Sequence, residues 1–301
     1  MLNFHGDSYT GKAQAAQTLV GEGDVLVAGR WGHFLVPPND RYIARSILKY
    51  GEYNKGEADV LSQLITPGQT VVEVGANLGT HTVMLAKKVG SAGKVYAVEP
   101  QRLIFGYLSA QVVLNRLKQV QLLHGALGEK AGTMHIADLG WDEIYNYGAA
   151  ALESTGTNPV NVMRLDDLGL AACDLIKIDV EGAERAVLMG ATDTIEKFRP
   201  ILYVENDRKD NSPALIEWLF AHDYRVYWDL PYVFSADNYF EDTVNVFGMM
   251  CSLNMICVPR ERPGAVAREE IRDAGDWLVT DDWRWKDVAR ANRSSPNPLA
   301  E

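Results

Sequence analysis

The sequence predicts an α/β fold in which a mostly parallel, doubly wound sheet carries helices on both faces. Three observations predict it. From residue 70 onwards, short hydrophobic runs alternate with segments that have apolar residues at helical spacing. A glycine-bearing turn joins the first of these strands to the first helix. The last strand, residues 252–258, follows the strand at 225–228 through a long loop without a helix, which is typical of an antiparallel hairpin that closes the sheet.

The predicted elements follow one another in a regular order. Strands are predicted at 70–74, 94–98, 119–123, 174–178, 200–204, 225–228 and 252–258, and helices at 79–89, 103–117, 182–190 and 213–222. The strand runs are rich in Val, Ile and Leu, as expected for strands that are buried on both faces. The stretch between the third and fourth strands shows no regular pattern.

The chain divides into three parts. Residues 1–56 are predicted to be an N-terminal extension, made of a hairpin at 24–28 and 32–36 and a helix at 40–50. A domain at 57–260 opens with a helix at 57–65, which ends at Thr66-Pro67-Gly68. Residues 261–301 are predicted to be a charged, Trp-bearing tail with a frayed end.

The charge balance excludes several classes of partner. The 301 residues include 40 Asp and Glu against 29 Lys and Arg, for a net charge of −11. Proteins that bind nucleic acids or anionic membranes are usually basic on the working face, so we expect neither partner. No apolar stretch approaches the roughly 18 residues of a membrane span, and the N-terminus lacks the pattern of a secretory signal. Three cysteines do not form a disulfide framework, so we expect a cytoplasmic enzyme.

The most informative segment is VVEVGANLGTHT at residues 71–82. A hydrophobic strand leads through Glu73 into Gly75 and Gly79, where the backbone can turn sharply and approach a ligand closely. This spacing lacks the third glycine of a dinucleotide-binding loop. The second strand ends at Glu99, whose carboxylate can accept hydrogen bonds from both ribose hydroxyls of an adenosine. Two acids and two glycines in this arrangement favour S-adenosylmethionine, a cation without a pyrophosphate, over NAD.

At this point the sequence resembles the FkbM-type S-adenosylmethionine-dependent methyltransferases. The runs that carry the resemblance are VVEVGANLGTHT (71–82), GKVYAVEP (93–100), LHGALG (123–128), DLIKIDVEGAE (174–184) and RPILYVEN (199–206). The resemblance covers about residues 50–260. It implies the class I methyltransferase fold, a Rossmann-like, seven-stranded sheet with order 3-2-1-4-5-7-6 and an antiparallel last strand. It also implies O-methylation of a hydroxyl, in bacteria typically on a sugar or a polyketide-type small molecule.

These motifs nominate the residues that hold the cofactor. We expect contacts from Glu73, Gly75, Ala76, Asn77, Gly79, Thr80, His81, Glu99, Pro100, Gly125, Ala126 and Asp179. Glu52, Tyr53 and Glu57 precede the first core strand, and we expect them to close over the methionine end of the cofactor. Residues 1–49 and 261–301 lie outside the resemblance and are candidates for substrate specificity or self-association.

Methyl transfer from a sulfonium to a hydroxyl needs in-line positioning and removal of a proton. Because ligands bind beyond the carboxyl ends of the strands, the candidates for catalysis are His81, Asp179 and Glu205. A second mechanism stays open, in which Asp179, Glu205 and Asn206 bind a divalent cation such as Mg²⁺ that lowers the pKa of the hydroxyl.

Two other functions stay open at this point. An NAD-dependent oxidoreductase shares the acid after the second strand, and a catalytically silent methyltransferase-fold module would keep the sheet as an interaction surface. The partner that we expect is a small-molecule acceptor, and the sequence leaves a homo-oligomer open. Aromatic residues around the last loop are candidates for acceptor contact, although a place in the core is the commoner role for such residues. They are Trp228, Tyr232, Phe234, Tyr239 and Phe240.

Overall fold

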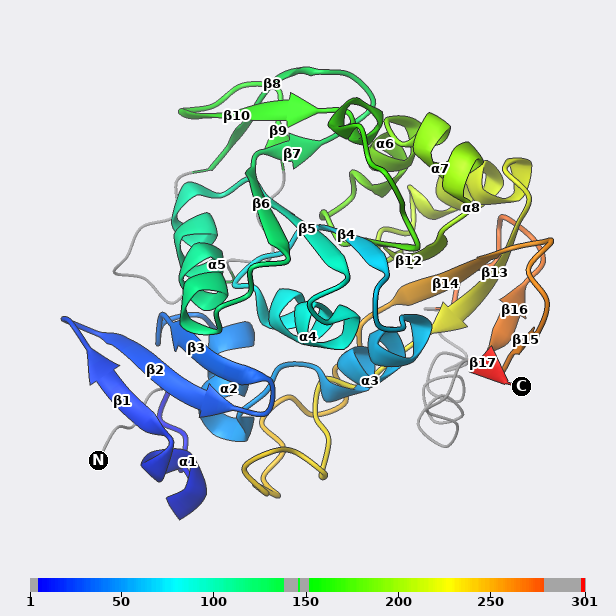
Figure 1. Cartoon of the computed structure of the whole chain (residues 1–301). Coiled ribbons are helices and arrows are strands. Elements are labelled where there is room, and N and C mark those ends of the chain that lie inside the picture. Colours follow the sequence, from blue (N-terminus) through cyan, green and yellow to red (C-terminus); the bar gives the residue numbers. More distant parts are fainter. Residues whose placement is uncertain (1–4, 138–145, 147–151, 279–298, 301) are drawn as a thin grey trace.

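An eight-stranded sheet forms the centre of the molecule in the computed structural model, which describes residues 5–137, 146, 152–278 and 299–300. From one edge to the other, its strands are β6 Val120–His124, β5 Lys94–Glu99, β4 Thr70–Val74, β11 Leu175–Ile178, β12 Ile201–Glu205, β14 Asn254–Pro259, β13 Tyr224–Asp229 and β16 Glu269–Ile271. The five strands from β6 to β12 are parallel, and β14 lies antiparallel to both β12 and β13 (Figure 1). The predicted α/β class, with a Rossmann-like mixed sheet, is confirmed.

The predicted count of seven strands needs a correction. The strands from β6 to β13 follow one another as the order 3-2-1-4-5-7-6 places them, but β16 adds an eighth strand at the edge. β16 comes from the segment expected to be a charged tail, and it pairs with β13 from Val226 to Trp228. Trp277 of the same segment packs edge-on against Trp228, with ring centroids 6.3 Å apart. Residues 279–298 and 301 of the expected tail lie outside the described residues.

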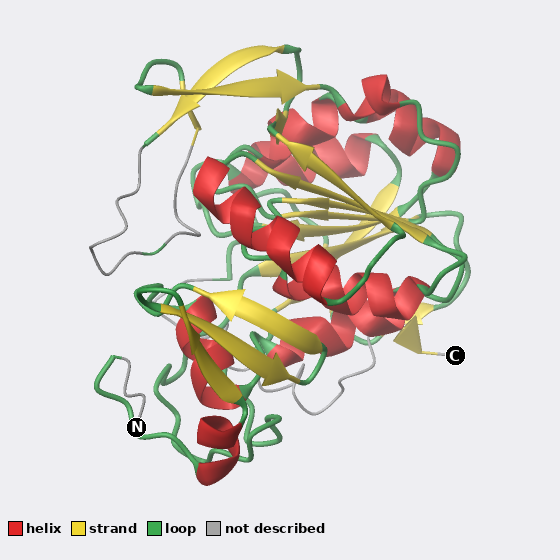
Figure 2. Cartoon of the chain, turned by 60° about the vertical axis from the view of Figure 1, so that its left-hand side comes forward, coloured by secondary structure: helices red, strands yellow, loops and turns green. Residues whose placement is uncertain are grey.

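Alternation along the strands explains why helices cover both faces of the sheet (Figure 2). Val71 and Leu175 belong to one buried cluster, while Val72 and Ile176, one residue further along, belong to another. The first cluster takes in α3 Lys55–Leu64, α4 Thr80–Val89 and α5 Arg102–Leu114. The second takes in α6 Glu184–Met189, α7 Thr192–Phe198 and α8 Ser212–Ala221. α7 was not predicted. None of the helices in the described residues combines the length and the apolar character that a membrane crossing requires.

The N-terminal residues share the core of the sheet. The predicted hairpin forms as β2 Asp24–Gly29 and β3 Gly32–Val36, and β1 Gln17–Val20 adds an unpredicted third strand. α1 Gly11–Ala15 precedes this small sheet, and α2 Ile43–Tyr50 follows it. Val25, Phe34 and Ile47 lie in the same buried cluster as residues of α4, so the extension is packed onto the main sheet.

The irregular stretch between β6 and β11 forms a second small sheet that the sequence did not predict. Its order is β7 Ala126–Leu127, β10 Asn158–Met163, β8 Gly132–Ile136 and β9 Leu152–Glu153. A 3₁₀ turn at Leu165–Leu168 then leads into β11. A short pair, β15 Ala265–Val266 with β17 Leu299–Ala300, lies near the C-terminus.

Candidate active site

A pocket opens at the carboxyl ends of β4, β5, β11 and β12, where a parallel sheet usually binds its ligands. Residues predicted from the sequence line it, namely Glu73, Gly75, Ala76, Asn77, Thr80, His81, Glu99, Pro100, Gly125, Ala126, Asp179 and Glu205. The structure therefore brings most of the predicted cofactor and catalytic residues together, with Gly79, Asn206 and Glu52 as the exceptions; Glu52 pairs with Arg30 instead.

The two glycines of the first loop have different roles. Gly75 has φ +83°, and a Cβ there would lie 1.8 Å from the carbonyl oxygen of Asp179, so only glycine fits between β4 and the end of β11. Gly79 has the same φ and caps α4, but a Cβ on it would meet Leu108 of α5 at 2.8 Å. Gly79 therefore permits close helix packing, and it does not line the pocket.

Glu99 is fixed as a hydrogen-bond acceptor at the end of β5. Its carboxylate accepts from the backbone N–H of Asn77 at 2.9 Å and from that of Gln101 at 2.8 Å. A carboxylate offers about four acceptor sites, so these two bonds leave further sites toward the pocket. Burial raises the pKa of Glu99 to about 7, and the two backbone N–H groups oppose that rise. The group is thus held in place by backbone N–H groups, with no ion pair to any residue that the structure describes.

Glu73 and Lys177 lie side by side on neighbouring strands and point to the face covered by α3 and α4. Their positions are paired in the ladder between β4 and β11. Glu73 is 1% exposed and accepts a hydrogen bond from the hydroxyl of Thr82 at 2.5 Å. Burial raises its pKa to about 7, against the effects of Lys177 and Thr82. A buried acid at this position favours a cation in the pocket.

Lys177 connects acids from two parts of the chain. Its Nζ lies 3.0 Å from Oδ2 of Asp179, which follows β11, and 3.7 Å from Oε1 of Glu57, in the first turn of α3. The side chain of Lys177 is 3% exposed, whereas that of Asp179 is 39% exposed toward the pocket. Burial by itself would raise the pKa of Asp179, but the ammonium group of Lys177 outweighs it and lowers that pKa. Asp179 therefore presents an ionised carboxylate to a ligand.

Three carboxylates meet at the far end of the pocket. One oxygen each from Asp179, Glu181 and Glu205 lies within 4.8 Å of the others. Burial and then the charge of Asp179 raise the pKa of Glu205 well above its usual range, and the same causes raise that of Glu181 to about 7. Two such close carboxylates favour a proton on Glu205 over one on Asp179, because the pKa of Glu205 is raised and that of Asp179 is lowered.

His81 faces the same space from the first turn of α4. It is 7% exposed, and its Nδ1 lies 3.7 Å from Oε1 of Glu57. Its Nε2 is buried and has no hydrogen-bond partner within the described chain. Burial, reinforced by the charge of Lys177, lowers its pKa to about 3. His81 is therefore a neutral imidazole with an unsatisfied nitrogen at the pocket.

Asn206 does not reach the pocket. Its Nδ2 donates to Oγ of Ser212 at 2.8 Å and contacts the sulfur of Met255 at 3.3 Å. Successive side chains on an extended segment point to opposite sides, so Asn206 faces away where Glu205 faces the pocket. The predicted metal set of Asp179, Glu205 and Asn206 does not assemble, and Glu181 takes the third place in the cluster.

Several lining residues were not predicted as site residues. Lys177 is one of them, although its place two residues before Asp179 in the same extended segment puts both side chains on one side. Others come from outside the strand–turn motifs, namely Tyr42, Ile43, Val233, Met250 and Ser252. The sequence carries no local signal that the two segments holding them meet at one pocket.

Comparison with known protein families shows to which family the chain belongs. The model of the methyltransferase FkbM domain matches residues 73–226, which is half of the chain. The chain belongs to the FkbM methyltransferase family. The matched region contains the first loop, the acid at the end of β5 and the ends of β11 and β12. Among curated proteins, none matches the chain.

Solved methyltransferase structures are similar to the chain. The FkbM methyltransferase of Methylobacillus flagellatus is 18% identical, with a TM-score of 0.42, over 62% of this chain and 43% of that one. This chain therefore spans less than half of that FkbM protein. Fibrillarin of Aeropyrum pernix, in complex with S-adenosyl-L-methionine, is 13% identical, with a TM-score of 0.41, over 78% and 94%. The O-methyltransferase TomG of Streptomyces achromogenes is 12% identical, with a TM-score of 0.41, over 68% and 78%.

Proposed function

We propose that the protein is an S-adenosylmethionine-dependent O-methyltransferase that acts on a small-molecule hydroxyl. The observation that carries the proposal is the Glu99 carboxylate, held by two backbone N–H groups at the end of β5, in a pocket whose other lining charges are mostly acidic. Membership of a methyltransferase family supports it and speaks against the NAD-dependent oxidoreductase.

The residues present fit this cofactor. Gly75 lets the end of β4 pack directly against the carbonyl of Asp179, and it lines the pocket with Ala76 and Asn77, where the methionine part is proposed to lie. Glu99 has acceptor sites left for the ribose hydroxyls, and Gly125 and Ala126 lie next to it for the adenine. Glu73, Asp179 and the unsatisfied Nε2 of His81 suit a cationic sulfonium and an ammonium group. When bound, S-adenosylmethionine supplies an electrophilic methyl group.

The protein's own contribution is position and proton transfer. The acceptor oxygen forms its bond to the methyl carbon as the bond from carbon to sulfur breaks, so the hydroxyl must lie in line with that bond. We propose Asp179, which is ionised and exposed to the pocket, as the group that accepts the hydroxyl proton. Glu205, whose carboxyl group lies beside that of Asp179, is proposed to orient it. His81, which is 7% exposed and has a buried Nε2 without a hydrogen-bond partner in the described chain, is proposed to bind the cofactor instead.

A metal-assisted mechanism is the alternative for the same reaction. The carboxylates of Asp179, Glu181 and Glu205 are close enough together to hold a divalent cation such as Mg²⁺. Lys177 already places an ammonium group 3.0 Å from Asp179, which is the reason to prefer the side-chain base.

Isothermal titration calorimetry tests the proposal. We expect one site for S-adenosylmethionine and no heat with NAD. Binding of NAD alone would contradict the proposal. Absence of binding by either compound would instead support a catalytically silent module.

A further inference from the structure

The pocket has two ends, and sheet order separates them. Glu99 ends β5, while Glu205 ends β12, three strands further along, with β14 beyond it. With the ribose at Glu99, as the proposed function requires, the cofactor occupies the end at β5 and β4. The end at β12 and β14 is left for the acceptor, because the methyl group must face it.

Apolar and aromatic side chains line that second end. Tyr42 and Tyr53 come from the N-terminal segment, and Val233 and Met250 come from the loop between β13 and β14. Tyr50 ties the two segments together, since Val233 and Phe247 pack in one buried cluster with it. All of these residues lie outside the 73–226 region that matches the family model. The cofactor end is thus built by the region that matches the family model, whereas the apolar lining of the acceptor end comes from outside that region.

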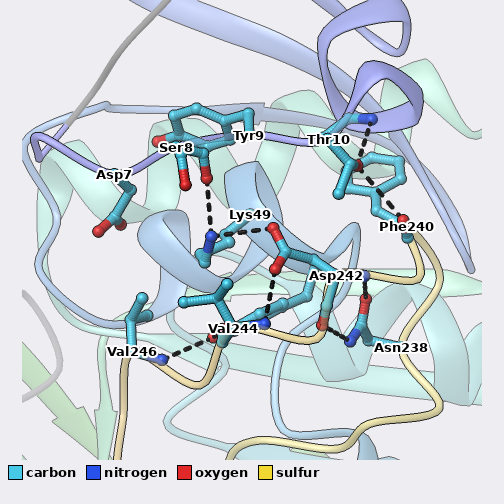
Figure 3. A network of polar contacts seen from close by, with 12 residues as sticks. Asp7, Ser8, Tyr9, Thr10, Lys49, Asn238, Phe240, Asp242, Val244 and Val246 are labelled. Atoms are coloured by element: carbon cyan, nitrogen blue, oxygen red, sulfur yellow. Dashed lines mark hydrogen bonds and ion pairs between the residues drawn. The ribbon is translucent and has the colours of Figure 1, made fainter.

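A buried ion pair holds the loop in place. Lys49 in α2 is fully buried, and its Nζ donates to the carbonyl of Ser8 at 2.7 Å and to the carboxylate of Asp242 at 2.9 Å (Figure 3). Asp242 in turn accepts from the backbone N–H of Val244 at 2.9 Å. Asn238 closes the turn by donating to the carbonyl of Asp242 and accepting from its N–H. Removing one partner of a buried ion pair leaves the other charge uncompensated. Lys49 therefore stabilises the conformation of the loop between β13 and β14, which forms one wall of the acceptor end.

More contacts attach the same loop to the N-terminal segment. The hydroxyl of Tyr50 donates to the carbonyl of Val244 at 2.8 Å and accepts from the N–H of Val246 at 3.0 Å. Glu52 accepts from the N–H of Tyr239 at 2.8 Å and pairs with Arg30 at 2.7 Å. These contacts hold the loop between β13 and β14 in one position, although it contains no helix or strand. A surface that selects a substrate needs such a fixed position.

The two kinds of lining suggest what the acceptor is. The ionised Asp179, with Glu181 and Glu205 beside it, would repel a carboxylate or phosphate near the reacting hydroxyl, and Lys177, the cation among the described lining residues, is already paired. Tyr42, Tyr53, Val233 and Met250 would desolvate the body of the acceptor, which favours an apolar face over one covered with hydroxyls.

We propose that residues 42–53 and 233–252 form the acceptor subsite, and that it takes an uncharged hydroxyl compound with an apolar face. This inference rests on the proposed function and narrows its substrate class. It assigns acceptor choice to Tyr42, Tyr53, Val233 and Met250, with Lys49 as a positioning residue that acts through the loop.

A panel of acceptors tests the class. The full chain is incubated with S-adenosylmethionine and with substituted phenols and cyclohexanols, their carboxylated counterparts, or free hexoses, and formation of S-adenosylhomocysteine is measured. We expect turnover with neutral ring alcohols or phenols, and at least tenfold slower turnover with the carboxylated counterparts and with hexoses. No turnover with any neutral ring compound, or faster turnover with the charged or sugar acceptors, would overturn the proposal.

Matched variants test the assignment on an acceptor found in this way. Met250→Ala is expected to raise the acceptor KM about five- to tenfold by removing apolar contact, with the Kd of S-adenosylmethionine within about twofold. Met249→Ala is the control, because Met249 is 47% exposed and does not line the pocket. Equal effects of the two variants, or a change in cofactor Kd alone, would overturn the assignment.

Lys49→Met tests the support of the wall from outside the pocket. We expect at least a tenfold rise in acceptor KM with an unchanged cofactor Kd, whereas Lys12→Met, which breaks the exposed pair with Glu241 on the same loop, leaves both constants unchanged. An unchanged acceptor KM in Lys49→Met would remove Lys49 from the account. If that variant does not fold, the comparison of Met250→Ala with Met249→Ala still tests the assignment of the acceptor subsite. Failure of the wild-type chain to bind S-adenosylmethionine would instead refute the proposed function itself.

Discussion

Replacing Glu99 with alanine is expected to weaken the binding of S-adenosylmethionine by about two orders of magnitude. The carboxylate is positioned by Asn77 and Gln101 and has acceptor sites left for two ribose hydroxyls. A hydrogen bond to a charged acceptor contributes about 1.5 kcal/mol, so losing two costs about 3 kcal/mol, or roughly a 150-fold rise in Kd.

Calorimetry at pH 8 measures this change, with Glu99→Gln as a graded variant. The glutamine keeps the shape and one acceptor oxygen but loses the charge, so we expect roughly a tenfold rise in Kd. Glu217→Gln, on the exposed face of α8, is the control and leaves the Kd unchanged. A folded Glu99→Ala protein that binds within twofold of the wild type would refute the placement of the ribose.

The remaining predictions concern the same pocket. Gly75→Ala is expected to destabilise the protein by about 3 kcal/mol or more, because its Cβ would overlap the carbonyl of Asp179. Gly169→Ala is the control and is expected to cost only about 1 kcal/mol, because Gly169 has φ +62° but open space around it. Urea unfolding measures both variants, and equal losses would contradict the close approach at Gly75. Because burial raises the pKa of Glu73 from 4.5 to about 7, the folded state without cofactor binds more protons than the unfolded chain in this range and loses stability as pH rises through it. Glu73→Gln should therefore raise the free energy of unfolding by up to about 3 kcal/mol at pH 8, seen as a higher melting temperature, but not at pH 4.5. The same variant should bind the cofactor more weakly. An equal gain in stability at both pH values would refute the shifted pKa. Methyl transfer is expected to survive exhaustive treatment with EDTA, and loss of activity that added Mg²⁺ restores would establish the metal-assisted mechanism instead.

The parts of the fold that were predictable are those with local signals. The strand at Thr70–Val74 and the turn at Gly75 are set by hydrophobic runs and by a backbone conformation that glycine adopts readily. Glu73, Glu99 and Asp179 could be placed at one edge because the carboxyl ends of parallel strands lie together.

The parts that escaped prediction depend on contacts between distant residues. α7 has two threonines and an aspartate in seven residues, and the carboxylate of Asp166 caps it from 28 residues away, by accepting from the N–H of Thr194 at 2.8 Å. β16 has only three residues and is a strand because β13 offers it an edge.

The same reasoning applies to the site. Glu57 reaches Lys177 because α3 packs over the sheet, and nothing near Glu57 in the sequence shows this. Asn206 was assigned by its position after β12, whereas the alternation of side chains turns it toward Ser212. The position of a residue in the sequence predicted which strand end it follows, but not the direction in which its side chain points.

A crystal structure with bound S-adenosylhomocysteine tests the central claim most directly. The account predicts the ribose hydroxyls within about 3 Å of the Glu99 carboxylate, the methionine part over Gly75, and the sulfur directed toward Asp179 and the end of β12. Density for the ligand elsewhere, or a ribose that makes no contact with Glu99, would contradict it.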